Sequence, residues 1–194
     1  MDEKFLVIGL GNPGRQYLRS RHNVGFMLVD RLAGEMTTRF SRLHANALIS
    51  QGCIGSSKVI LAKPQTFMNL SGRAVRGLVR FHKLPLENII IAHDDLDIPL
   101  GVLRIRPDGG SGGQKGLSSI LEYLGTDKFP RLRIGIGRPP GHMKAPDFVL
   151  DDFSDGEFVE INDVLERGVL AVKEWILNGL DACMNKYNGK NPDL

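Results

Sequence analysis

The sequence predicts a single-domain α/β fold, and three observations support this class. The chain has 194 residues, close to the usual size of one domain, and 42% of them are hydrophobic, which is enough for one continuous core. Two short apolar runs, at residues 5–10 and 89–92, are each followed by a polar segment, as is typical of buried strands. Segments with helical spacing alternate with strand-like segments. We therefore expect one domain over residues 1–194.

The expected strands are apolar or β-leaning segments bounded by Gly, Pro or polar residues. They lie at residues 5–10, 45–53, 58–62, 89–92, 102–106 and 131–137. The second and third of them are expected to form a hairpin through the Gly-Ser-Ser sequence at 55–57.

The expected helices carry apolar residues every three or four positions. They lie at residues 23–36, 70–81 and 117–124, and over a long region that begins near residue 155. Pro85 prevents the second helix from continuing, and Gly125 ends the third. Ser154 and Glu157 have the spacing of a capping box at the start of the last helix.

Composition argues against a membrane protein and indicates a cytosolic one. Every apolar run is interrupted within about ten residues, whereas a membrane span needs about 20, and no signal-peptide pattern follows Met1. Cys53 and Cys183 lack the spacing of a zinc site or a redox pair, so we expect both to be reduced. The net charge of +3 is mild but is consistent with a polyanion bound at one basic face.

His22 is a candidate general base because it lies in a polar segment before the first expected helix. An imidazole accepts a proton from water at neutral pH if a neighbour fixes its tautomer. Asp94, Asp95 and Asp97 are candidate neighbours, since ligand sites in α/β sheets lie at the carboxyl ends of strands. Asp94 is favoured because it is the first carboxylate after the strand. A plain surface histidine is the alternative.

Two further alternatives involve bound groups. The glycines of 9–14 match a dinucleotide fingerprint, but Pro13 and a polar stretch stand where a helix is required, and Asp30 lies within an expected helix. His93 and the aspartates that follow it could bind Mg²⁺ or Zn²⁺, but they are equally suited to capping a loop. We therefore expect no metal and no cofactor.

Asn69 stands just before the second expected helix. It is either the N-cap of that helix or an amide that holds water or a carbonyl oxygen, with Phe67 and Met68 as an apolar wall. The glycine-rich segment 109–113 is either a flexible loop or a backbone nest for an anion.

Five motifs occur in the order and spacing of the bacterial peptidyl-tRNA hydrolase family, which the chain resembles from residue 5 to about residue 185. They are GLGNPG at 9–14, RHNVG at 21–25, TFMNLSG at 66–72, HDDLD at 93–97 and RLRIGIG at 131–137. The resemblance implies a central twisted mixed sheet with helices on both faces and a monomeric protein. It also implies metal-independent cleavage of the ester that links a peptide to the 3′ ribose of tRNA, which recycles the tRNA.

Residue roles follow from the same motifs. The resemblance implies that His22 is the general base, that Asp94 orients it, and that Asn12 and Asn69 position substrate or water.

The resemblance also implies the binding surfaces. It places Tyr17 and Met68 in the peptide groove, and it directs Arg104, Arg106 and Arg133 toward the tRNA acceptor stem. The arginines at 104 and 106 share one strand face by their period of two, as do those at 131 and 133.

One motif departs from the family. The common pattern has His-Asn-Gly where this chain has Gln-Lys-Gly at 114–116. Lys115 therefore cannot make the usual asparagine contact, and we expect it to meet phosphate or ribose as a point charge.

A non-catalytic RNA-binding protein is the rival from another class, because the family includes a chloroplast splicing-factor branch with the same fold. The joint presence of Asn12, His22, Asn69 and Asp94 favours the enzyme.

Overall fold

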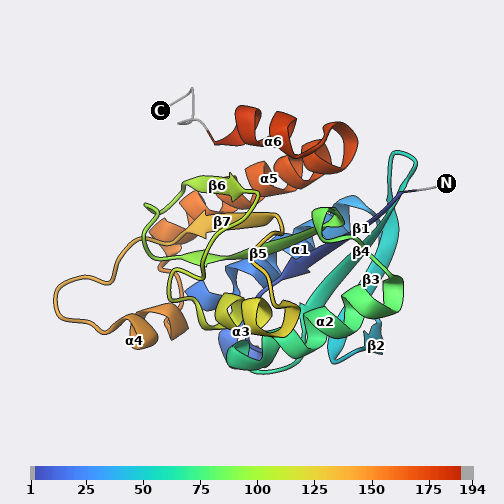
Figure 1. Cartoon of the computed structure of the whole chain (residues 1–194). Helices are drawn as coiled ribbons and strands as arrows, with labels where there is room; N and C mark the ends of the chain where they lie inside the picture. The colour runs from blue at the N-terminus through green and yellow to red at the C-terminus, as the bar shows by residue number, and fades with distance from the viewer. Residues whose placement is uncertain (1–2, 189–194) are drawn as a thin grey trace.

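A seven-stranded mixed sheet forms the centre of the computed structural model, which describes residues 3–188 (Figure 1). Its strands lie in the order β2-β3-β4-β1-β5-β7-β6. Their bounds are β1 Lys4–Gly9, β2 Arg42–His44, β3 Ala47–Ile54, β4 Ser57–Pro64, β5 Ile89–Asp95, β6 Leu103–Arg106 and β7 Arg131–Gly135. The four central strands are parallel, and β2, β3 and β6 are antiparallel to their neighbours. The α/β class and the mixed sheet are confirmed.

Helices cover both faces of the sheet. Their bounds are α1 Val24–Glu35, α2 Ser71–His82, α3 Lys115–Leu124, α4 Ala145–Leu150, α5 Asp155–Asn178 and α6 Leu180–Tyr187. Figure 1 shows α2 and α3 on one side of the sheet and α5 and α6 on the other. Within residues 3–188, no helix combines the length and the apolar character that crossing a membrane requires.

Alternation along the strands produces two cores, one on each face. In β1, Leu6 and Ile8 are buried in the core beneath α2 and α3, whereas Phe5 and Val7 belong to the core beneath α1 and α5. A strand that is buried on both faces is therefore apolar throughout, as the sequence predicted for residues 5–10. The carboxyl ends of these buried strands form one edge of the sheet.

Three features differ from the sequence prediction. Strand β5 continues through His93, Asp94 and Asp95, which were expected to form a loop, because these residues pair with β7. Helix α2 begins at Ser71 with Leu70 as its N-cap, so Asn69 does not cap it and lies in a 3-10 turn instead. The structure also contains β2, α4 and α6, which are too short or too polar to give a clear periodic pattern.

Candidate active site

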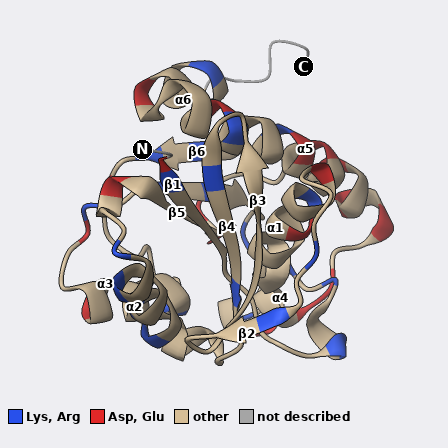
Figure 2. Cartoon of the chain, turned by 90° about the vertical axis from the view of Figure 1, so that its right-hand side faces the viewer, with Lys and Arg blue, Asp and Glu red and all other residues tan. Residues whose placement is uncertain are grey.

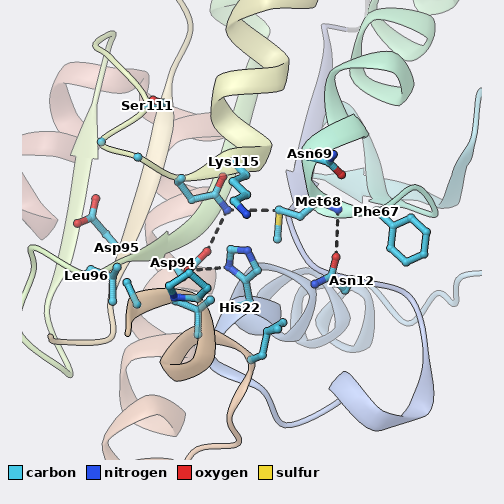
Figure 3. Close-up of a pocket in the computed structure, with 17 residues that line it drawn as sticks. Asn12, His22, Phe67, Met68, Asn69, Asp94, Asp95, Leu96, Ser111 and Lys115 are labelled. Carbon is cyan, nitrogen blue, oxygen red and sulfur yellow. Dashed lines mark hydrogen bonds and ion pairs between the residues drawn. The ribbon is translucent and has the colours of Figure 1, made fainter. Parts of the chain in front are cut away.

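A pocket of about 550 Å³ opens at the carboxyl ends of β1 and β5 (Figure 3). The segments that line it come from the loop after β1, the turn before α1, the turn before α2, the N-terminus of α3, and α4. Of the residues expected at the site, those in its lining are Asn12, His22, Met68, Asn69, Asp94 and Lys115.

His22 and Asp94 meet in this pocket although 72 positions separate them in the chain. The Nδ1 atom of His22 lies 2.8 Å from Oδ2 of Asp94, and both side chains are buried. Figure 3 shows the carboxylate pointing at the imidazole ring. A buried carboxylate at this distance favours the tautomer in which Nδ1 carries the proton, so Nε2 is left as the acceptor.

Close backbone packing brings these two residues together. A Cβ on Gly25 would lie 2.4 Å from the carbonyl oxygen of Ala92, so only glycine allows the start of α1 to approach the end of β5. Gly9 is under the same constraint, because its Cβ would lie 2.1 Å from the carbonyl oxygen of Gly25. The turn that carries His22 directly precedes α1 and is held beside Asp94 by this packing.

Arg21 fixes the same turn from its other side. Its guanidinium is buried, stacks 4.2 Å from the ring centre of Phe148 in α4, and donates to both carboxylate oxygens of Glu157 in α5. Burial acts to raise the pKa of Glu157, but hydrogen bonds from Ser154 and Arg21 outweigh it and hold the pKa below its ordinary value. Arg21 therefore anchors the residue next to the candidate base.

Gln114 is a site residue that the sequence did not reveal. It is the N-cap of α3, where its Oε1 accepts a hydrogen bond from the backbone N–H of Leu117 at 2.6 Å. Its Nε2 donates to Oδ1 of Asp94 at 3.0 Å, while Oδ2 of that carboxylate faces His22. Both oxygens of Asp94 are thus held. The departure from the family pattern at 114–116 was the available signal, but it was interpreted for Lys115 alone, and glutamine is not a residue typical of an N-cap.

Asn12 joins two of the loops around the pocket. Its Oδ1 accepts from the backbone N–H of Met68 at 3.0 Å, and its backbone is held on both sides by the amide of Asn23. This orientation leaves the Nδ2 group of Asn12 without a hydrogen-bond partner in the described part of the chain. Asn69 lines the pocket with an exposed side chain. Two amides are therefore available to a bound molecule.

Of the two remaining residues expected to contact the substrate, Lys115 lines the pocket and Tyr17 does not. Lys115 is the first residue of α3 and lines the pocket. Tyr17 lies in a 3-10 turn, half-buried, and is not among the lining residues, so the structure does not bring it to the pocket.

The expected RNA-binding arginines lie on the adjacent strands β6 and β7. Arg104 is opposite Arg133, and Arg106 is opposite Arg131, as a shared strand face requires. Arg133 donates to Asp95 at 2.7 Å, whereas Arg106 is exposed. Arg104 is half-buried and is engaged by backbone carbonyls at 103 and 188.

Arg131 has a structural role although its spacing matches that of Arg133. It is 2% exposed and donates to the carbonyls of Gly109, Gly110 and Asp127. The glycine-rich loop is therefore held from below by a buried guanidinium.

The carboxylates after the buried strand do not converge on one point. Asp94 faces His22, Asp95 pairs with Arg133, and Asp97 pairs with Arg138. Among residues 3–188, no group of three His, Cys, Asp or Glu side chains is placed to hold a metal ion.

The dinucleotide alternative is wrong. After β1 the chain forms two 3-10 turns, at 15–17 and 21–23, and the first α-helix begins only at Val24. The glycines at 9 and 11 instead allow contact with Gly25 and with the ring of Phe26.

Comparisons with known proteins identify the family of the chain. Residues 6–193 match the family model described as peptidyl-tRNA hydrolase. The chain is 51% identical over 186 residues to a peptidyl-tRNA hydrolase of Desulforamulus reducens, covering 96% of this chain and 89% of that protein. It is 45% identical to one from Syntrophomonas wolfei, covering 94% and 99% of the two chains. The crystal structure of peptidyl-tRNA hydrolase from Acinetobacter baumannii is similar with a TM-score of 0.91 and 34% identity, covering 99% and 98%.

Proposed function

This chain belongs to the peptidyl-tRNA hydrolase family and hydrolyses peptidyl-tRNA, and we propose that His22 is the general base of the reaction and Asp94 its orienting partner. The substrate ester joins a peptide to the 3′ ribose of tRNA. The observation that carries the proposal is the 2.8 Å contact between Nδ1 of His22 and Oδ2 of Asp94 inside the pocket.

The proposed reaction needs one proton acceptor with a fixed orientation. Neutral His22 takes a proton from water at Nε2, and the resulting oxygen nucleophile attacks the ester carbonyl. Asp94 stabilises the imidazolium that forms. The bond between the carbonyl carbon and the ribose oxygen then breaks, and the proton on His22 passes to that oxygen. The products are the free carboxylic acid of the peptide and a tRNA with its 3′ terminal hydroxyl.

We propose that the two pocket amides stabilise the negative charge that develops on the carbonyl oxygen, by donating hydrogen bonds to it. Nδ2 of Asn12 is unpaired in the described structure, and Asn69 is exposed in the lining, so each is free to donate. One such donor typically contributes about 10²–10³-fold to kcat. In this proposal Met68 forms the apolar wall of the peptide groove, Lys115 meets phosphate or ribose as a point charge, and Tyr17 is left out of the binding set.

Other parts of the proposal concern the protein as a whole. We propose that residues 1–194 act as one domain, as a monomer, in the cytoplasm, and that the reaction uses neither a metal nor another cofactor. Recycling of tRNA is the purpose that this reaction would serve in the cell.

A turnover assay of wild type and His22→Ala tests the proposal. The substrates are N-blocked and unblocked aminoacyl-tRNA, with a metal chelator present. We expect wild type to cleave the N-blocked substrate, and kcat of the variant to fall by roughly 10²–10⁴-fold without loss of folding. A variant with near-normal kcat would refute the assignment of the base. Tight RNA binding by wild type without turnover would instead favour the RNA-binding rival.

A further inference from the structure

Helix α2 presents a row of exposed cations away from the sheet. Arg73, Arg76 and Arg80 lie on the helix, and Lys83 follows at its C-cap. Their spacing of three, four and three residues places all four within about a quarter of the helix circumference. The buried residues of α2, such as Ala74 and Leu78, lie on the opposite side. We call these four cations the α2 stripe.

The α2 stripe has no acidic partner in residues 3–188. Helix α2 contains no Asp or Glu, and none of the four cations forms an ion pair or hydrogen bond with another described residue. Two of the three arginines expected to bind RNA are less free, because Arg133 pairs with Asp95 and Arg104 is engaged by carbonyls. The α2 stripe is therefore a group of four exposed cations without a side-chain partner among residues 3–188.

The charge around the C-terminal end of α2 is positive as well. The pKa of His82 is lowered, first by burial and then by nearby basic groups, among them Lys4 and Arg42. Like charges three or four residues apart also destabilise a helix by themselves. A bound polyanion would remove that repulsion.

The opposite face of the molecule has the opposite charge. Helix α5 carries six acidic and two basic residues in its sequence. Figure 2 shows red segments along α5 and blue segments on α2. A polyanion is therefore attracted to the α2 side of the sheet and repelled from the α5 side.

The α2 stripe also starts at the pocket. Met68 and Asn69, which line the pocket, belong to the turn that leads directly into α2. At a rise of about 1.5 Å per residue, the α2 stripe extends about 15 Å from Arg73 to Lys83. A backbone that leaves the pocket along α2 would meet the four cations in succession.

We infer that the α2 stripe is a second RNA contact surface, which binds phosphates of the same tRNA whose 3′ end occupies the pocket. This inference rests on the proposed function, because it takes peptidyl-tRNA as the occupant. The contacts would be to the backbone and independent of sequence, since exposed cations on a helix bind phosphate without reading bases.

The test compares wild type with the triple variant Arg76→Gln, Arg80→Gln and Lys83→Gln. Arg73 is kept because it lies nearest the pocket. A matched control, Arg167→Gln, Lys173→Gln and Lys186→Gln, removes the same charge from α5 and α6. Each protein is assayed at several salt concentrations on full-length N-blocked aminoacyl-tRNA and on the N-blocked aminoacyl ester of a CCA trinucleotide.

For the triple variant we expect KM on full-length tRNA to rise by roughly tenfold or more near 0.1 M salt. The slope of log KM against log salt should fall by about 2 to 3, since each lost phosphate contact removes about 1. The α5 and α6 control should keep the wild-type slope. Cleavage of the trinucleotide ester should be unchanged in both variants.

Three results would overturn this inference or its premise. A triple variant with the wild-type KM and salt slope on full-length tRNA removes the α2 stripe from the RNA surface and leaves the proposed function intact. An equal loss of cleavage activity on full-length tRNA and on the trinucleotide ester indicates a structural role for α2, and this result also overturns the inference. Wild type that cleaves neither substrate instead contradicts the proposed function.

Discussion

The bottom of the pocket and the basic surfaces beside it are built in different ways. In the pocket, His22, Asp94 and Gln114 come from distant segments, are buried, and hold one another through hydrogen bonds of 2.8 and 3.0 Å. On the surface, Arg106 and the α2 stripe are exposed and have no ion-pair partner in the described chain. Buried side chains held in a fixed arrangement are suited to proton transfer, whereas exposed cations are suited to contact the phosphates of a mobile polyanion. Substitutions in the pocket should therefore lower kcat, and substitutions on the surface should raise KM and change the salt dependence.

The largest effect is expected for Asp94→Asn. An amide at this position can donate to Nδ1 of His22 and so favour the tautomer that carries its proton on Nε2, which cannot accept one from water. We expect kcat to fall by roughly 10²–10⁴-fold and KM to change much less. Steady-state kinetics on N-blocked aminoacyl-tRNA measure this split. A rise in KM with unchanged kcat would assign Asp94 to binding instead.

A smaller loss of kcat is expected for Gln114→Ala. This variant frees one oxygen of Asp94 and removes the N-cap of α3, so we expect a decrease of roughly tenfold in kcat and about 1 kcal/mol in the free energy of unfolding.

Gln114→His is the matched control, because histidine can still donate to Asp94. If Gln114 positions the carboxylate, the histidine variant should keep most of the wild-type kcat. Equal losses in the alanine and histidine variants would show that only packing or capping matters.

The sequence predicted those parts of the molecule that depend on local pattern. The apolar runs at 5–10 and 89–92 form β1 and β5, and the capping box of Ser154 and Glu157 begins α5. His22, before the first helix, was expected to pair with Asp94, at the end of a buried strand, and the two side chains are in contact. The α2 stripe was also available in the sequence, from the spacing of its arginines on an expected helix.

Features that depend on tertiary contacts were not predicted. Polar residues 93–95 continue β5 only because β7 pairs with them. Arg131 and Arg133 have equivalent positions in the pattern, yet burial under the glycine loop makes one structural. Gln114 reaches Asp94 because α3 begins at the pocket, and a cap residue alone does not predict that distance.

On the surface, Arg106→Gln should affect binding alone. Loss of one exposed phosphate contact should raise KM a few-fold and lower the salt slope by about 1, with kcat unchanged. Arg106→Lys keeps the charge and should keep the slope. A loss of kcat in the glutamine variant would indicate that Arg106 contributes to catalysis. It would contradict the proposed division between pocket residues that set kcat and surface residues that set KM.

The smallest effect on turnover is expected for Glu157→Gln, which acts on stability. It leaves Arg21 buried without its carboxylate partner, and we expect the free energy of unfolding at pH 7 to fall by about 1–3 kcal/mol. The pKa of Glu157 is lowered from 4.5 in the folded state, so its contribution is present above that value and is lost as the pH falls through the folded pKa.

Denaturant unfolding of both proteins between pH 7 and pH 3 measures this difference. The difference in the free energy of unfolding between wild type and Glu157→Gln should decrease as the pH falls toward 3. A gap that is constant with pH would mean that the carboxylate charge contributes nothing.

The central claim is that His22 accepts a proton from water while Asp94 holds its other nitrogen. The most direct measurement is the pH dependence of the single-turnover rate for wild type and His22→Ala on N-blocked aminoacyl-tRNA. We predict that the wild-type rate falls on the acid side with the loss of one proton-accepting group, and that the low residual rate of the variant lacks this decrease. A variant with the same acid-side decrease, or with a rate near that of wild type, would contradict the claim.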